Sequence, residues 1–152
     1  MLISSKNEHE NVEHAKQFCK KFKSSKAPKY LFGRNLYARS VLENINIDGI
    51  IDDYTSDKSW NKHPVFSSCQ VPKDALVLIC SGGSTQTALE RIKSLGLECL
   101  DYFAFLKFSD IPSLEDVVFN EKFEQEFYEN AERYFSIYNK LQDYQSKSIF
   151  KK

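Results

Sequence analysis

The fold is decided by the stretch Lys29-Tyr30-Leu31-Phe32-Gly33-Arg34-Asn35-Leu36-Tyr37-Ala38-Arg39. A short apolar run ends at Gly33, and after a polar turn the apolar residues repeat with helical spacing: Leu36, Ala38, Val41, Leu42 and Ile45. A strand, a glycine turn and a helix in this order open the βαβ unit of nucleotide-binding folds. We therefore expect residues 29–39 to begin a parallel sheet.

The same pattern returns along the chain. Residues 47–51 form a second strand-like run, and Ala75-Leu76-Val77-Leu78-Ile79-Cys80 is continuously apolar, as expected of a strand covered on both faces. A glycine turn at 81–85 leads into a helix over 86–95, and a strand resumes over 97–105. This order predicts the α/β class: a three-layer, Rossmann-like parallel sheet of about four to five strands with right-handed crossovers. Residues 54–64 read as irregular, with a short strand at 65–66.

Both ends of the chain read as helical. An apolar face with helical spacing predicts a helix from Glu8 to about Lys23, before a break at Pro28. A capping-box-like start lies at 113–116, and an aromatic-rich pattern predicts one long helix over about 121–145. We expect three regions: an N-terminal helix and linker (1–28), the α/β domain (29–112) and a C-terminal helical segment (113–152). The apolar residues near its end predict that this segment leads into a further, catalytic domain.

Composition excludes several classes of function. The chain has 152 residues, and its 21 basic and 21 acidic side chains balance, so charge indicates neither a nucleic-acid partner nor an anionic membrane. No apolar run approaches the length of a membrane span. The four cysteines form no C-x-x-C pair and no metal-like cluster, so we expect no metal site and a reducing, cytoplasmic location.

The first candidate site is the turn Gly33-Arg34-Asn35. Backbone N–H groups at the start of a helix are what an anion site requires. Arg34 could offer a cation to a phosphate, or it could block the close approach of a pyrophosphate to the backbone. The alternative is a βα turn that needs one glycine for its geometry.

The acidic pair and the second glycine turn are further candidates. Asp52 and Asp53 follow the second strand where a carboxylate can accept the hydroxyls of a ribose, although aspartate is also common in turns. The turn Ser81-Gly82-Gly83-Ser84 could cradle a phosphate or simply cap the next helix. No nucleophile stands beside an evident base and no Gly-Lys-Ser/Thr occurs, so we assign no catalytic residue.

Several segments together resemble the region that precedes the catalytic domain in bacterial FkbM-family methyltransferases. The resemblance covers roughly residues 29–152 and rests on Tyr30-Leu31-Phe32-Gly33, Asp48-Gly49-Ile50-Ile51-Asp52-Asp53, Trp60 with His63-Pro64-Val65, Val77-Leu78-Ile79-Cys80, Gly96, Asp101-Tyr102-Phe103, and Tyr138-Asn139-Lys140-Leu141-Gln142-Asp143-Tyr144-Gln145-Ser146. It implies that S-adenosylmethionine binds in a downstream domain. Similar modules open some sugar acyltransferases and sugar-nucleotide enzymes, where the turn and the acidic pair face a nucleotide-sugar.

Three functions follow as hypotheses. The first is an accessory domain of an S-adenosylmethionine-dependent methyltransferase that acts on a sugar or glycan and is not catalytic alone. The second is a stand-alone module that binds a nucleotide or a nucleotide-sugar. The third is a structural or dimerisation domain, whose C-terminal helix contacts a catalytic domain or a second copy of the chain.

Overall fold

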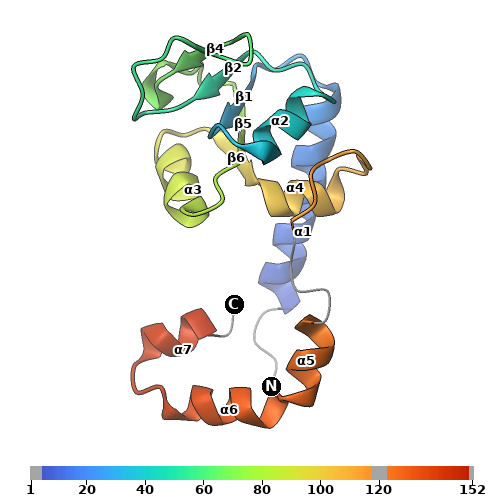
Figure 1. The fold of residues 1–152 in the computed structure, drawn as a ribbon, viewed down its shortest axis with the longest axis vertical. Helices are drawn as coiled ribbons and strands as arrows, with labels where there is room; N and C mark the ends of the chain where they lie inside the picture. Colours follow the sequence, from blue (N-terminus) through green and yellow to red (C-terminus); the bar gives the residue numbers. More distant parts are fainter. Residues whose placement is uncertain (1–4, 118–122, 151–152) are drawn as a thin grey trace. The chain divides into compact units, whose positions relative to one another are not determined.

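The protein is a mixed α/β structure, seen here in a computed structural model that describes residues 5–117 and 123–150 (Figure 1). The chain divides into two compact units, Met1–Asp116 and Val117–Lys152. The elements follow in the order α1 (Ser5–Ser24), β1 (Lys29–Phe32), α2 (Leu36–Leu42), β2 (Gly49–Ile51), β3 (Ser59–Trp60), β4 (His63–Phe66), the 3₁₀ turn η1 (Ser68–Gln70), β5 (Leu76–Ile79), α3 (Thr85–Ser94), β6 (Glu98–Asp101), α4 (Tyr102–Phe108), α5 (Phe123–Glu129), α6 (Ala131–Lys140) and α7 (Tyr144–Phe150).

The first unit is built on a six-stranded sheet in the order β3-β4-β2-β1-β5-β6. All neighbours are parallel except β3 and β4, which pair antiparallel at one edge. The parallel α/β sheet predicted from the sequence is thus confirmed. Its strand count is six, because the short edge strand β3 was not expected.

The strands of this sheet are apolar on both sides. All four residues of β5 are buried, as the continuous apolar run predicts. Because side chains alternate along a strand, Val77 and Ile79 face one layer and Leu76 and Leu78 the other. The first pair packs in a cluster with Ala88 and Ile92 of α3. The helices α1, α2 and α4 gather on the side of the sheet away from α3 (Figure 1).

Aromatic side chains join α1 to α4. The rings of Phe18 and Phe22 stack with centroids 5.4 Å apart, and Phe22 meets the edge of Phe105 at 5.5 Å. All three side chains have no exposed surface. The predicted N-terminal helix therefore exists and belongs to the core of the first unit.

The prediction of a strand through Phe105 was wrong. The strand β6 stops at Asp101, whose carboxylate accepts a hydrogen bond from the Ala104 N–H at 2.9 Å and so caps α4. Tyr102 and Phe105 are both buried at a helical spacing of three. An aromatic run suits a strand or a buried helix equally, and here the capping carboxylate selects the helix.

The prediction that residues 54–64 are irregular was also wrong in part. Residues 59–66 form a hairpin, in which Ser59 pairs with Pro64 and Trp60 with His63. Asn61 and Lys62 between them both have positive φ, at 46° and 68°. Two such residues make the type I′ turn that closes two-residue hairpins, and asparagine tolerates this backbone.

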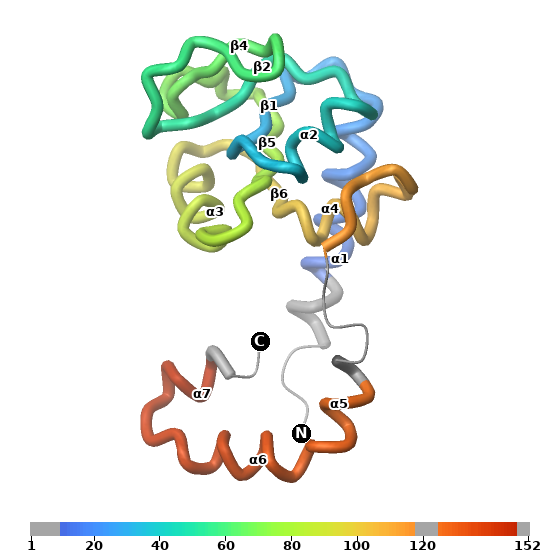
Figure 2. Tube along the Cα trace, in the orientation of Figure 1, coloured from blue at the N-terminus to red at the C-terminus, as the bar shows by residue number. Residues whose placement is uncertain are grey.

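The helix start expected at 113–116 is absent. This segment runs back beside α2 after α4 (Figure 2), where the Ser113 hydroxyl donates to Asn44 Oδ1 at 2.6 Å. The Tyr102 hydroxyl donates to the Glu115 carbonyl at 2.7 Å, and Leu114 is buried. Residues 112–114 form a turn and a bend. Tertiary contacts thus override the capping pattern of the segment.

The described part of the second unit contains three helices where one long helix was predicted; residues 121 and 122 of that prediction lie outside the described residues. The first break falls at Asn130, between α5 and α6. The second follows Leu141, and the Asp143 carboxylate accepts from the Ser146 N–H at 2.7 Å to start α7. Asparagine and aspartate favour caps over helix interiors because their side chains compete for backbone hydrogen bonds.

Two leucines test this account of the core. We expect Leu78→Ala, at a side chain with no exposed surface, to lower the free energy of unfolding by about 2–5 kcal/mol, because it leaves a cavity. Leu36→Ala removes the same atoms from a side chain that is 62% exposed. This substitution should change the free energy of unfolding by less than about 0.5 kcal/mol. Urea unfolding followed by the fluorescence of Trp60 measures both, and equal losses would contradict the assigned core.

Candidate functional site

A side-chain hydrogen bond joins the turn after β1 to the end of β5: Asn35 Nδ2 donates to the Cys80 carbonyl. The Oδ1 atom of the same side chain accepts from the Ala38 N–H at 3.1 Å and so caps α2. Gly33 has φ +107°, and a Cβ there would lie 3.4 Å from the Cys80 carbonyl group. Gly33 is therefore needed for its backbone angle, and its missing side chain leaves the two turns in direct contact.

These two turns lie where the connections of the sheet diverge. β1 has β2 on one side and β5 on the other, with all three parallel. From β1 the chain passes through α2 to β2, whereas from β5 it passes through α3 to β6 at the opposite edge. Open α/β sheets bind ligands at such a point, beyond the carboxyl ends of the strands.

Arg34 is held by two carboxylates. Its Nε lies 2.8 Å from Asp52 Oδ2, and its Nη1 lies 2.7 Å from Asp57 Oδ2. The hydrogen bond to Asp57 and the charges of both carboxylates raise the pKa of Arg34, and the same hydrogen bond lowers the pKa of Asp57. The positive charge that could have met a phosphate is thus balanced within the chain.

The two adjacent aspartates face different partners. Asp52 stays at the β1 turn with Arg34, and its Oδ1 also accepts from the Tyr54 N–H at 2.9 Å. Asp53 binds Arg91 of α3, whose Nε is 2.7 Å away, and the Ser68 N–H, also at 2.7 Å. Burial alone would raise the pKa of Asp53, but the bonds from Ser68 and Arg91 outweigh it and lower that pKa.

The turn Ser81-Gly82-Gly83-Ser84 is the open part of the site. Gly82, Gly83 and Ser84 are exposed, and the Ser84 side chain makes no capping bond to α3. Ser81 orders the turn, because its Oγ accepts from the Ser84 N–H at 3.3 Å and its carbonyl accepts from the Thr85 hydroxyl at 2.6 Å.

Neither glycine of this turn is required by the fold. Their φ angles lie outside the left-handed region, which in this chain is occupied among glycines by Gly33 and Gly96. A Cβ on Gly82 would meet only the Tyr37 ring, at 3.8 Å, and a Cβ on Gly83 would have open space. Backbone that a side chain could cover without strain is here left bare at the surface.

The structure brings most of the predicted site residues together. The turn after β1 holds four of them: Gly33, Arg34, Asn35 and Asp52. The 81–84 turn lies beside this group, because Asn35 binds the Cys80 carbonyl and the Tyr37 ring borders Gly82. Asp53 is turned towards α3 instead.

Sequence reasoning missed the partners of these residues. Asp57 and Arg91 come from a loop and from the far part of α3, and no spacing in the sequence links them to Arg34 or Asp53. Tyr37 stacks on Tyr102 with ring centroids 4.7 Å apart and borders Gly82.

The cysteines supply no nucleophile to this site. Cys80 is closest, but burial raises the pKa of its thiol strongly, as it also raises the pKa of Cys99. A buried neutral thiol behaves as a small hydrophobic group, as the position of both cysteines at the ends of apolar runs predicts.

Acid titration tests the Asp53 contact. Because the folded-state pKa of Asp53 is lowered, its stabilisation is present above its unfolded value and is lost as the pH falls through the folded pKa. Asp53→Asn should lower the free energy of unfolding by about 1 kcal/mol at pH 7, and by progressively less below about pH 4. Urea unfolding between these values measures the difference. The exposed Asp74→Asn serves as control, and a loss that is the same at every pH would contradict a charge-based contact.

Within residues 5–117 and 123–150, no three side chains of His, Cys, Asp or Glu gather as they would around a metal ion. No helix in these ranges combines the length and apolarity needed to cross a bilayer. Comparisons of the chain with protein-family models, curated proteins and solved structures found no match. Its function is therefore inferred from its own residues.

Proposed function

We propose that the first unit is a Rossmann-like module that binds the phosphate-bearing part of a nucleotide or nucleotide-sugar and is not catalytic alone. The observation that carries this proposal is the bare backbone of Gly82 and Gly83 at the point where the connections of the sheet diverge. Glycines that the fold does not require are expected where a ligand must approach the backbone closely.

The strand order supports the Rossmann-like assignment. Numbered along the chain, the five parallel strands lie across the sheet in the order 3-2-1-4-5. This is the order at the centre of doubly wound nucleotide-binding sheets, in which the ligand lies beside strand 1. Here the first and fourth of these strands are β1 and β5, which precede the two turns.

The contacts at the turns define how the ligand is held. The phosphate would meet N–H and hydroxyl groups of residues 81–84 at the start of α3, which is ten residues long. Arg34 would stay with Asp52 and Asp57, because separating them exposes two carboxylates to the incoming anion. We assign no ribose contact to Asp53, whose two oxygens already accept from Ser68 and Arg91.

The resemblance to the FkbM-family region supplies the wider role. We propose that the module belongs to an S-adenosylmethionine-dependent methyltransferase of a sugar or glycan, whose methyl donor binds downstream. In this arrangement the module presents or selects the sugar substrate.

Calorimetric titration with a uridine diphosphate sugar, NAD and S-adenosylmethionine tests the proposal. We expect heat with the nucleotide-sugar or NAD and none with S-adenosylmethionine. The variant Gly82→Ala/Gly83→Ala adds two methyl groups that the fold has room for, so it should weaken binding at least about tenfold without lowering the unfolding midpoint. Ser94→Ala, at the other end of α3, is the matched control. An absence of heat with every nucleotide at millimolar concentration would remove support for this function.

The exposed apolar side chains of the second unit favour a second role, that of a contact surface. No side chain within residues 125–148 is buried. Tyr128, Phe135, Ile137 and Tyr144 are exposed, Phe135 by 56%. Exposed aromatic groups on short helices indicate a contact surface. We propose that its occupant is the catalytic domain that the resemblance places after residues 138–146.

Phe135→Asp tests this contact surface. We expect the present chain to be monomeric in light scattering and to bind a hydrophobic dye, and Phe135→Asp to reduce dye binding. The unfolding midpoint reported by Trp60, which lies in the first unit, should stay the same, and Ser136→Asp should change neither quantity. A dimer that dissociates in Phe135→Asp would instead identify a second copy as the occupant.

A further inference from the structure

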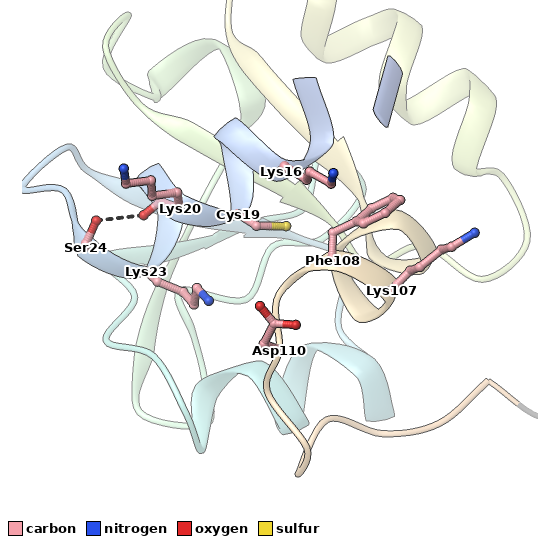
Figure 3. A pocket seen from close by; sticks show the side chains of 8 residues that line it. All are labelled: Lys16, Cys19, Lys20, Lys23, Ser24, Lys107, Phe108 and Asp110. Atoms are coloured by element: carbon pink, nitrogen blue, oxygen red, sulfur yellow. Dashed lines mark hydrogen bonds between the residues drawn. The ribbon is translucent and has the colours of Figure 1, made fainter. Parts of the chain in front are cut away.

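A hollow of about 550 Å³ lies between the second half of α1 and the end of α4 (Figure 3). Three lysines of α1 line it at helical steps of four and three: Lys16, Lys20 and Lys23. Lys107 and Phe108 line it from α4. Both helices belong to the first unit. The hollow is distinct from the turns that follow β1 and β5 (residues 33–35 and 81–84), which we call the β1–β5 turns.

Positive charge is concentrated in this hollow. Four ammonium groups line it and Asp110 is the one acidic side chain among its lining residues, although the whole chain has no net charge. Figure 3 shows the side chains of Lys23 and Asp110 projecting towards each other, that of Lys16 near Phe108, and those of Lys20 and Lys107 projecting to opposite sides. Lys16 also lies 3.5 Å from the exposed Glu13, a pair that solvent screens. The lysines thus keep a surplus of positive charge.

Part of the hollow is already ordered. The Lys23 ammonium donates to the Ser109 carbonyl, which fixes this lysine against the chain after α4. Asp110 follows with φ 58°, a left-handed backbone that aspartate tolerates. Lys107 lies above the ring of Phe108, 5.5 Å from its centroid.

The wall of the hollow is apolar beneath these charges. Phe108 is half-buried, and Cys19 is only 1% exposed. Burial raises the pKa of Cys19 to about 11, so the thiol is neutral at pH 7 despite the nearby Lys23. An anion alone would leave this apolar wall unused.

We propose that this hollow, which we name the lysine hollow, binds a small organic phosphate. The phosphate lies among the lysines, and an apolar group of the ligand lies against Phe108. The hollow has the volume of a small-molecule site, and lysine is a common point-charge partner of phosphate. A lipid headgroup offers the same chemistry, but a concave site between two helices favours a free ligand over a membrane surface.

Phenyl phosphate is the probe, because it carries a phosphate and one aromatic ring. In an NMR titration we expect amide shifts at residues 16–24 and 107–110, with weaker binding of inorganic phosphate and of benzyl alcohol. Affinity should fall about tenfold between low and high salt, because the ammonium groups are exposed to screening. Lys16→Gln/Lys20→Gln should weaken binding about tenfold or more, whereas Lys58→Gln/Lys62→Gln, which removes the same charge elsewhere, should leave it within about twofold.

Phe108→Leu separates the two halves of the proposal. It should weaken phenyl phosphate binding and leave inorganic phosphate binding unchanged. Shifts confined to residues 81–87 would place the ligand at the β1–β5 turns and overturn the proposal, as would an absence of shifts at millimolar probe. Co-sedimentation with phosphatidylcholine vesicles containing phosphatidic acid, without phenyl phosphate binding, would also overturn it.

Discussion

The structure depends on the side chain of Asn35. One amide joins the first turn of the sheet to the end of β5 and caps α2, through the Cys80 carbonyl and the Ala38 N–H. The Cys80 carbonyl is part of a buried residue at the end of β5, and an unpaired buried carbonyl would cost about 1–3 kcal/mol. The positive φ of Gly33 makes this contact geometrically possible. This junction adds a side-chain contact to the backbone pairing that joins β1 to β5 and so sets the strand order.

Most of the sheet could be predicted because its signals are local. The bounds of β1 follow from an apolar run between Pro28 and Gly33, and those of β5 from a run apolar at every position. Apart from residues 113–116, the errors fall where a short polar side chain decides the backbone: Asp101 starts α4, Asn61 turns the hairpin, and Asn130 and Asp143 divide the C-terminal helices. Each of these roles depends on a neighbouring N–H group or on an unusual φ, neither of which hydrophobic periodicity reports.

The candidate site was predicted as a set of positions but not as a set of contacts. Parallel strands end at one edge, so residues after β1, β2 and β5 had to lie near one another. Their partners are distant in sequence: Asp57 reaches Arg34 over 23 residues and Arg91 reaches Asp53 over 38. Such pairs form only after the sheet has placed them. Arg34 is the most evident phosphate partner in the sequence, but its charge is neutralised by ion pairs with Asp52 and Asp57.

The distribution of charge therefore distinguishes the two anion sites that we propose in the first unit. At the β1–β5 turns the charged groups neutralise one another, and the exposed donors are neutral N–H and hydroxyl groups of residues 81–84. In the lysine hollow the donors are ammonium groups in excess over one carboxylate. Neutral donors need short, directed contacts and so select the shape of a ligand, whereas ammonium groups attract over about a Debye length and select its charge. A chain with no net charge can hold both because opposite charges are paired in one place and kept apart in the other.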